Sequence, residues 1–347
     1  MTMRAAVLNA PGELELMTRD VPDPGPGEIL LRVEATTLCG TDVRLFTGEK
    51  TAGVRPEVTL GHEVAGRIAA VGEGVRNVAV GEQAVVSIVV SCHACRACLA
   101  DREHMCANLE LIGYAIDGGL ADYLLVPARA VAGGNVVTTN HPVPPTHLAL
   151  AEPVSCCLNG LDQYRVTAGD TVVILGAGPI GLIHTALARL HGATRIIVAN
   201  RGEARREAAV RVGATHTLDP RGVDLVAAVG ELTDGAGADV VVVCIGATEL
   251  AGRALELAAV GGRVSYFAGF PKGATAGIDP NLIHYRELTV TGGSNARRRD
   301  VVRAVRLLES GALPADEIVT HTFALADVHD ALEAVANKVG IKIAVVP

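Results

Sequence analysis

The chain has 347 residues, of which 49% are hydrophobic and 20% are charged, a composition typical of a soluble globular protein with more than one domain. Its formal net charge is −8, whereas nucleic-acid binding depends mainly on Lys and Arg side chains that neutralise phosphates. We therefore expect no nucleic-acid partner. The one basic run, Arg297 to Arg299, is interpreted as a solvated stretch at the start of a helix.

The hydrophobic stretches predict neither a secretory leader nor a membrane span. The stretch Met1 to Leu16 contains Asn9, Pro11 and Gly12, where a leader would need an uninterrupted apolar run. The most apolar stretch, 171–190, is broken by glycines and a proline, which suits a buried strand, a turn and a helix. We expect a cytoplasmic protein, in which the eight cysteines are metal ligands or buried thiols rather than disulfides.

Short apolar runs with glycine and proline between them dominate the first half of the chain, at 4–8, 28–35, 66–71 and 83–90. Brief strands with turn signals predict an antiparallel β domain.

The strongest motif of this half is a set of four cysteines with the spacing C-x2-C-x2-C-x7-C, namely Cys92, Cys95, Cys98 and Cys106. Four thiolates on one compact loop can close a tetrahedral shell around zinc and leave no position for a substrate, which predicts a structural zinc. Chance clustering and an iron–sulfur cluster are the alternatives, and nothing else in the sequence supports an electron-transfer protein. His93 and His104 could replace a thiolate, but four cysteines are sufficient.

From about residue 171 the pattern changes to alternating apolar strands and alanine-rich helices, which predicts βαβ units around a parallel sheet. The predicted strands are 171–175, 195–199, 240–244, 262–268 and 288–291, and the helices between them include 181–191, 203–212 and 249–258. The last part of the chain is expected to contain a helix at 300–310, a strand at 319–323, a helix at 326–336 and a strand at 341–346. We expect this tail to return to the first domain.

A glycine motif follows the first strand of the second half, where Gly176, Gly178 and Gly181 form G-x-G-x-x-G with Pro179 and Ile180 between the last two glycines. A strand before it, a helix after it and a second strand supply the context that this motif needs to predict dinucleotide binding. The first glycine permits the tight turn, the second lets the backbone approach the pyrophosphate, and the third allows close packing of the helix.

The end of the second strand normally selects the cofactor, because an acidic residue there binds the ribose diol and repels a 2′-phosphate. Here the sequence is Asn200-Arg201, and Arg205 and Arg206 follow. We therefore favour NADP(H). The alternative is that Arg201 points to solvent or stacks on adenine and that NAD(H) still binds.

Three dispersed motifs, Cys39-Gly40-Thr41-Asp42, Gly61-His62-Glu63 and Ala151-Glu152-Pro153, are weak when taken singly. In their order and spacing the chain resembles the zinc-containing medium-chain dehydrogenase/reductase family over nearly its whole length. The Glu in the last motif resembles the branch of sorbitol, threonine and glucose dehydrogenases. The resemblance implies an α/β fold with a GroES-like catalytic domain at 1–154, a Rossmann domain at 155–291 and a C-terminal return at 292–347.

The same resemblance implies two Zn²⁺ ions per subunit and a set of site roles. Cys39, His62 and Glu63 would be direct ligands of a catalytic zinc, and Glu152 would bind directly or through water. Asp42 would orient a ligand, and Thr41 would be the first link of a proton relay, between the alcohol and the cofactor ribose. Many relatives have a histidine three residues after that threonine. This chain has Arg44, which cannot shuttle protons near neutral pH.

The most strongly favoured reaction is oxidoreduction of a secondary alcohol in a polyol, a polyol phosphate or a cyclitol. The residues expected near the substrate are Phe46, Tyr114, Glu152 and the stretch 293–297. Several of them have polar side chains, which favours a hydroxyl-rich substrate over a long aliphatic alcohol. A threonine-type amino-alcohol dehydrogenase is the second hypothesis. A catalytically silent relative and a zinc-free quinone reductase are further alternatives, which the retained ligands disfavour. The family's dimers and tetramers suggest a homo-oligomer. Cys156, Cys157 and Cys244 are assigned to packing.

Overall fold

The computed structural model describes all residues from 1 to 347 and divides into two compact units. Unit 1 comprises Met1–Ser155, Asn295–Gly311 and Val319–Pro347, and unit 2 comprises Cys156–Ser294 and Ala312–Ile318. Both contain strands and helices. None of the helices combines the length and the apolar character needed to cross a lipid bilayer.

Unit 1 is built mainly of antiparallel strands. Its strands are β1 Thr2–Ala10, β2 Glu13–Asp20, β3 Ile29–Leu38, β4 Val58–Thr59, β5 Glu63–Val71, β6 Gln83–Val86, β7 Val89–Val90, β8 Glu110–Leu111, β9 Tyr123–Val126, β10 Val136–Thr138, β17 Val319–Ala324 and β18 Lys342–Val346. Its helices are α1 Gly40–Phe46, α2 Arg96–Leu99, η1 Glu103–Met105, α3 Ala128–Ala132, α4 Pro145–Leu148, α11 Arg298–Glu309, η2 Leu325–Asp327 and α13 Val328–Ala336.

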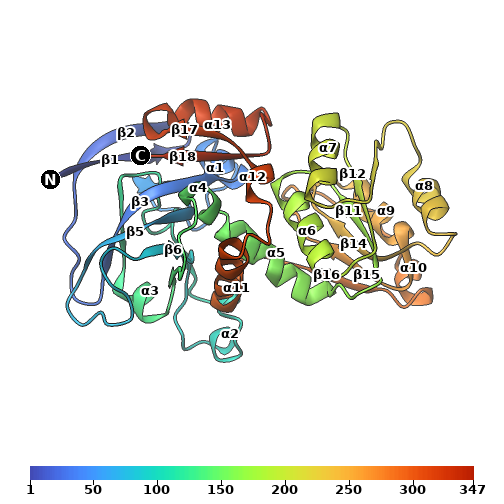
Figure 1. Cartoon of the computed structure of the whole chain (residues 1–347), viewed down its shortest axis with the longest axis horizontal. Helices are drawn as coiled ribbons and strands as arrows, with labels where there is room; N and C mark the ends of the chain where they lie inside the picture. Colours follow the sequence, from blue (N-terminus) through green and yellow to red (C-terminus); the bar gives the residue numbers. More distant parts are fainter. The chain divides into compact units, whose positions relative to one another are not determined.

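The central sheet of unit 1 has the strand order β10-β6-β5-β3-β18-β17, with β9 also paired to β3. Strands from both ends of the chain therefore meet, because β18 pairs antiparallel with β3 (Figure 1). A second sheet has the order β2-β1-β4, and β7 pairs with β8. The register of β3 against β5 places Thr37 opposite Glu63 and Thr36 opposite Val64, so the end of β3 lies beside the start of β5.

Helix α5, Ala151–Tyr164, begins in unit 1 and ends in unit 2. Unit 2 then contains the strands β11 Thr171–Leu175, β12 Arg195–Ala199, β13 His216–Leu218, β14 Ala238–Val243, β15 Ala258–Tyr266 and β16 Thr289–Gly292. Its helices are α6 Pro179–Leu190, α7 Glu203–Val212, α8 Leu225–Leu232, α9 Glu249–Leu257, α10 Pro280–Tyr285 and α12 Ala315–Ile318.

The sheet of unit 2 is fully parallel, with the order β13-β12-β11-β14-β15-β16. All five residues of β11 are buried, as expected for a central strand covered by helices on both faces. The order reverses direction at β11, and ligands of such sheets bind at the carboxyl ends of the strands at this point. The predicted combination of a GroES-like domain with a Rossmann-type sheet is confirmed.

Candidate active site

The four cysteines of the C-x2-C-x2-C-x7-C motif come together in the loop after β7, with all four sulfurs within 4.8 Å of one another. The Sγ atoms of Cys92 and Cys106 are 3.5 Å apart, as are those of Cys95 and Cys98, and those of Cys95 and Cys106 are 3.9 Å apart. Two sulfurs bound tetrahedrally to one zinc at about 2.3 Å would be separated by about 3.8 Å. The donor set and its spacing therefore fit a structural zinc.

Backbone N–H groups surround two of these sulfurs. Those of Ala94 and Cys95 lower the pKa of Cys92 to about 6, and those of Ala107 and Cys98 lower the pKa of Cys95. The Cys98 thiol has the opposite shift, because burial raises its pKa to about 11. Zinc binds the thiolate form of cysteine. The loop that carries the four cysteines, the cysteine lobe, therefore favours this form at Cys92 and Cys95 before any metal binds.

The second donor group lies where β3 ends and β5 begins. Cys39 is the residue before α1, and His62 and Glu63 stand at the start of β5. The ligand atoms of these three residues lie within 4.8 Å of one another, and the side chains of His62 and Glu63 are buried. The structure thus brings a thiolate, an imidazole and a carboxylate together, a donor set that suits a catalytic zinc.

Asp42 is positioned to orient two of these donors. One of its carboxylate oxygens accepts a hydrogen bond of 2.8 Å from the backbone N–H of Cys39, and the other lies 3.1 Å from Nδ1 of His62. Burial alone would raise the pKa of Asp42, but His62 and the Cys39 N–H outweigh burial and lower that pKa. An ionised Asp42 that binds Nδ1–H leaves Nε2 of His62 available to a metal.

The structure adds two partners of Glu63 that the sequence did not predict. Lys342 Nζ is 2.6 Å from the carboxylate of Glu63, and Thr37 donates its hydroxyl hydrogen to the same carboxylate. Lys342 is 4% exposed and Glu63 is 1% exposed. Burial opposes the charge of Lys342, but Glu63 and Cys39 outweigh burial and raise the pKa of Lys342. A single lysine in the apolar strand 342–346 was the available signal.

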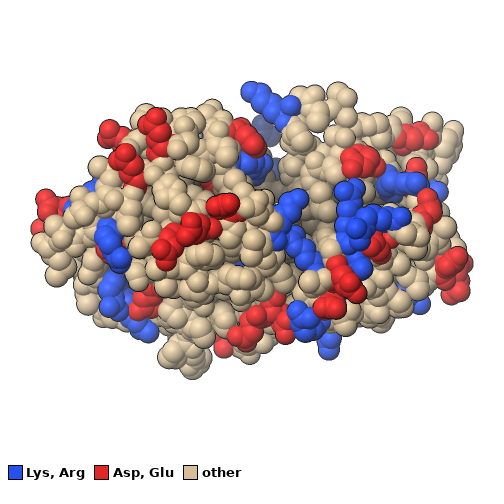
Figure 2. All heavy atoms as spheres, turned by 90° about the horizontal axis from the view of Figure 1, so that it is seen from above, with Lys and Arg blue, Asp and Glu red and all other residues tan.

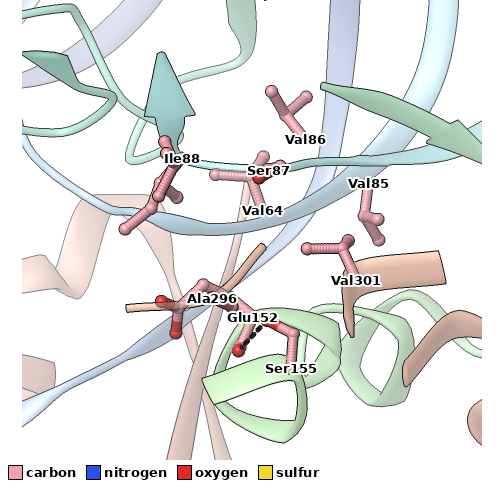
Figure 3. A pocket seen from close by; sticks show the side chains of 10 residues that line it. Val64, Val85, Val86, Ser87, Ile88, Glu152, Ser155, Ala296 and Val301 are labelled. Carbon is pink, nitrogen blue, oxygen red and sulfur yellow. Dashed lines mark hydrogen bonds between the residues drawn. The ribbon is translucent and has the colours of Figure 1, made fainter. Parts of the chain in front are cut away.

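Glu152 lies near this donor group but outside it. It is at the start of α5, where its backbone carbonyl accepts a hydrogen bond of 2.6 Å from Ser155 Oγ. Both residues line a cavity of about 10 Å³ with Val64, Ala296 and Val301, which is room for about one water molecule (Figure 3). The negative charge of Glu152 contributes to raising the pKa values of Tyr114 and Lys342, so its carboxylate acts on the site electrostatically.

Thr41 is 9% exposed and lies on the first turn of α1. Its Oγ1 accepts a hydrogen bond of 2.9 Å from the guanidinium of Arg44. The ring of Tyr114 is 5.5 Å from that of His62, and Lys50 Nζ stands 4.7 Å from the centre of the Tyr114 ring. Phe46 is on the same helix but packs into the hydrophobic core of unit 1.

In unit 2, the three glycines of the motif differ in what a Cβ atom would meet at their positions. Gly176 has φ of +110°, and a Cβ at that position would meet Ile245 at 2.5 Å. A Cβ on Gly181 would collide with the carbonyl oxygen of Gly176, so only glycine lets α6 pack this closely on β11. A Cβ on Gly178 would meet only Nη1 of Arg205, at 3.9 Å, which leaves the backbone open to a ligand. Pro179 and Ile180 begin α6.

The turn after β12 carries no carboxylate. Asn200 accepts a hydrogen bond of 3.2 Å from the Ala177 N–H in the glycine turn. The backbone carbonyl of Arg201 accepts hydrogen bonds of 2.8 Å from both Arg206 and Arg221, whose guanidinium groups also bind Asp219. Figure 2 shows Lys and Arg side chains interleaved with Asp and Glu side chains over the half of the molecule drawn at the right. The turn is thus held by two arginines, and the side chain of Arg201 is exposed.

The interpretation of Arg297 to Arg299 as a solvated stretch is wrong for Arg297. Helix α11 does begin here, but Arg297 is 7% exposed. Asp300, at the third position of the helix, accepts 3.1 Å and 2.7 Å hydrogen bonds from the backbone N–H and Nε of Arg297. The capping carboxylate thus draws the guanidinium inwards and neutralises it there.

Two family models match the chain. That of the alcohol dehydrogenase GroES-like domain matches residues 25–134, and that of the zinc-binding dehydrogenase matches residues 179–310. The first contains the four cysteines and Cys39, His62 and Glu63, and the second begins within the glycine motif.

Relatives with several named activities cover most of the chain. An L-threonine 3-dehydrogenase of Pyrococcus furiosus is 37% identical over 89% of this chain and 88% of its own length. An L-galactonate-5-dehydrogenase of Escherichia coli K12 is 31% identical over 96% and 95%, and an erythritol/L-threitol dehydrogenase of Mycolicibacterium smegmatis is 32% identical over 99% and 98%. A zinc-binding dehydrogenase of Sinorhizobium meliloti 1021, solved with NADP, superposes with a TM-score of 0.94 at 37% identity and covers both chains fully.

Proposed function

The chain belongs to the zinc-containing medium-chain dehydrogenase family of NAD(P)-linked alcohol dehydrogenases, and we propose that it transfers a hydride between a secondary alcohol of a polyol or cyclitol and NADP. The observation that carries this proposal is the group formed by Cys39, His62 and Glu63, with Asp42 hydrogen-bonded to two of them. A core that served only packing would not bury an imidazole, two carboxylates and a lysine together.

Cys39, His62 and Glu63 would hold the catalytic zinc, with Glu152 as a direct or water-mediated fourth partner. Zinc would supply Lewis acidity there, which makes an alcohol hydroxyl easier to deprotonate. Asp42 keeps the ring of His62 in one orientation. Lys342 and Thr37 hold the carboxylate of Glu63 and offset its charge, which limits the negative charge of the site.

The proton of the alcohol is proposed to leave through Thr41. Because Arg44 donates to Oγ1 of Thr41, that oxygen keeps one lone pair for the alcohol proton while its own hydrogen is passed on. A guanidinium cannot accept a proton near neutral pH, so the route does not continue through Arg44. A bound nicotinamide would supply the acceptor for the hydride that the carbinol carbon gives up as the alcohol becomes a ketone.

NADP is the proposed cofactor because no carboxylate follows β12. Asn200 takes the place of the usual acid and contacts the glycine turn, Arg205 supplies positive charge near Gly178, and the exposed Arg201 follows Asn200 directly. The nearby acid, Asp219, is neutralised by Arg206 and Arg221, which lower its pKa. Arg201→Ala should raise the KM for NADP⁺ about 10-fold and leave the KM for NAD⁺ within about 2-fold. If wild-type protein turns over NAD⁺ far better than NADP⁺, this assignment is wrong.

A threonine-type activity is the second candidate, since the Pyrococcus relative is named for it. One panel separates the candidates: initial rates with polyols, polyol phosphates, cyclitols and L-threonine, each with NADP⁺ and with NAD⁺, before and after a chelator. Oxidation of L-threonine alone would replace the polyol assignment. Zinc and cofactor binding without turnover of any alcohol would instead indicate a silent relative.

We also propose a homodimer or homotetramer. Strand β16 is an edge strand of the unit 2 sheet, and Val260, Tyr285 and Val290 near it are exposed. An exposed edge with apolar side chains is suited to pairing with a second copy. Light scattering on the purified protein measures the mass of the oligomer. A monomeric mass at micromolar concentration would contradict a homodimer or homotetramer.

A further inference from the structure

Two cations, Arg44 and Lys50, lie beside the zinc donor group, and neither has a role in binding the substrate so far. The backbone N–H of Lys50 donates a 3.0 Å hydrogen bond to the carbonyl of Arg44, so the turn that follows α1 brings Lys50 back to Arg44 in the last turn of that helix. The guanidinium of Arg44 contacts Thr41, and the ammonium of Lys50 lies over the ring of Tyr114. Thr41 is the proposed proton acceptor, and Tyr114 packs beside His62. Arg44 therefore contacts the proposed proton acceptor directly, and Lys50 is separated from the zinc donor His62 by the ring of Tyr114.

Neither cation has an acidic partner in the protein. The hydrogen bond of the Arg44 guanidinium is to Thr41 and the ring contact of the Lys50 ammonium is with Tyr114, and both of these groups are uncharged. Asp42 is close, but its two oxygens are occupied by Cys39 and His62. Arg44 is exposed and Lys50 is half-buried, so both charges can meet an anion that comes from solution.

The electrostatics of Lys50 agree with this arrangement. Partial burial and the charge of Arg44 lower the pKa of Lys50, while Cys39 and Asp42 raise it and offset part of the shift. The contact with Tyr114 holds the ammonium in place but does not neutralise it. A bound anion would remove the repulsion between the two cations.

A purely structural explanation is that basic residues stabilise the C-terminal end of a helix. Arg44 does lie in the last turn of α1. However, its guanidinium points back to Thr41, on the first turn, rather than to the last carbonyls. Lys50 is past the end of the helix and packs on Tyr114, from a different part of the chain. The helix end therefore does not account for where the two charges lie.

We propose that Arg44 and Lys50 form an anion subsite beside the metal donors, which binds a carboxylate or phosphate carried by the alcohol substrate. This rests on the proposed function and narrows its substrate class to anionic hydroxy compounds, such as sugar acids and polyol phosphates. Arginine suits such groups because its fork of donors matches their oxygens, and lysine adds a point charge. Two of the relatives are named for substrates that carry a carboxylate, L-threonine and L-galactonate, and one is named for neutral polyols, erythritol and L-threitol. The names of the relatives therefore do not decide between an anionic and a neutral substrate.

The test compares matched substrates on the full-length zinc-loaded protein: galactitol with galactonate, and sorbitol with sorbitol 6-phosphate. The anionic member of at least one pair should have the higher kcat/KM. Arg44→Gln and Lys50→Gln should each lower the ratio of anionic to neutral kcat/KM about 10-fold, the loss of one charged hydrogen bond. Arg44→Lys should restore part of the ratio. A preference for galactonate identifies a carboxylate as the partner, and one for sorbitol 6-phosphate identifies a phosphate.

Arg76→Gln is the matched control. Arg76 is an exposed cation of unit 1 in the loop after β5, whereas Glu63 is at the other end of that nine-residue strand, whose two ends lie about 26 Å apart if it is extended. This variant should leave the ratio unchanged. The proposal is overturned if the wild type prefers the neutral member of both pairs, or if the ratio is the same in Arg44→Gln, Lys50→Gln and wild type.

A binding measurement decides the question even if no alcohol of the panel is oxidised, an outcome that would contradict the proposed function instead. Titration calorimetry with inorganic phosphate and with acetate, at saturating NADP⁺, should detect an anion site in the wild type. The Arg44→Gln/Lys50→Gln double variant should bind at least about 10-fold more weakly, and high salt should weaken binding to the wild type. Equal binding by both proteins overturns the subsite.

Discussion

The two metal-donor groups of unit 1 contain similar chemistry but are assembled in different ways. The four cysteines lie within 15 residues of one loop, between Cys92 and Cys106, and backbone N–H groups of the same loop lower the pKa values of two of them. The catalytic group instead joins Cys39, at the end of β3, with His62 and Glu63, at the start of β5.

The partners of the catalytic group come from still farther away. Lys342 is 279 residues from the Glu63 that it binds, and it arrives on β18 because that strand pairs with β3. A local cluster can form wherever its loop closes around a metal, whereas the distributed group needs the whole central sheet. The cysteine lobe should therefore govern local stability, and the distributed group should govern catalysis.

The largest effect is expected from Cys39→Ser. Loss of this ligand should lower kcat/KM at least about 10³-fold, because a Lewis-acid contribution of several kcal/mol is removed. The unfolding temperature should change little, since β3 and β5 remain paired. Metal analysis should find one zinc fewer per chain, and an unchanged zinc content with full activity would refute the assignment.

The double variant Cys95→Ser/Cys98→Ser should show the opposite pattern. Removing two thiolates should release the structural zinc, cost about 4 kcal/mol and lower the unfolding temperature by roughly 10 °C. Activity per folded molecule at low temperature should largely survive. Scanning calorimetry with a parallel rate assay checks both parts, and complete loss of activity in a folded protein would contradict this separation of roles.

Lys342→Met probes the long-range contact of the distributed group. Breaking a buried ion pair from one side should destabilise the protein by about 3 kcal/mol, because the carboxylate of Glu63 stays buried without its cation. The double variant Lys342→Met/Glu63→Gln should regain part of that stability. Urea unfolding of metal-depleted protein measures both, and equal stability of Lys342→Met and wild type would show that the pair is dispensable.

His184, in unit 2, provides a metal-independent reference. It is buried, its Nδ1 lies 2.7 Å from the hydroxyl of Tyr164, and burial lowers its pKa to about 3. The unfolded chain takes up the proton first as the pH falls below about 6.5, so stability should decrease from there and level off near pH 3, with a loss of about 2 kcal/mol at pH 5.

The variant His184→Gln should flatten this acid dependence, and His216→Gln, which changes an exposed histidine of the same unit, should not. Urea unfolding between pH 4 and 7, with and without a chelator, measures the slope. If His184→Gln retains the wild-type slope, another group causes the acid sensitivity.

The difference between a local cluster and a group assembled from distant segments also explains which features could be predicted from the sequence. The cysteine lobe and the glycine turn were recognisable because spacing within a few residues determines their geometry. Cys39, His62 and Glu63 were recognised only through resemblance to a family, since their meeting depends on strand pairing. Lys342 and Lys50 were missed because a single lysine has no local pattern that reports its partners. Arg297 was misassigned because its burial depends on Asp300, one turn along α11.

The most direct test of the whole account follows zinc content and NADP⁺ reduction on one protein sample as a chelator removes metal stepwise. The protein should contain two zinc ions per chain at the start, lose turnover as the content falls from two to one, and recover it when zinc is added back. Full turnover by protein that contains no metal would contradict it.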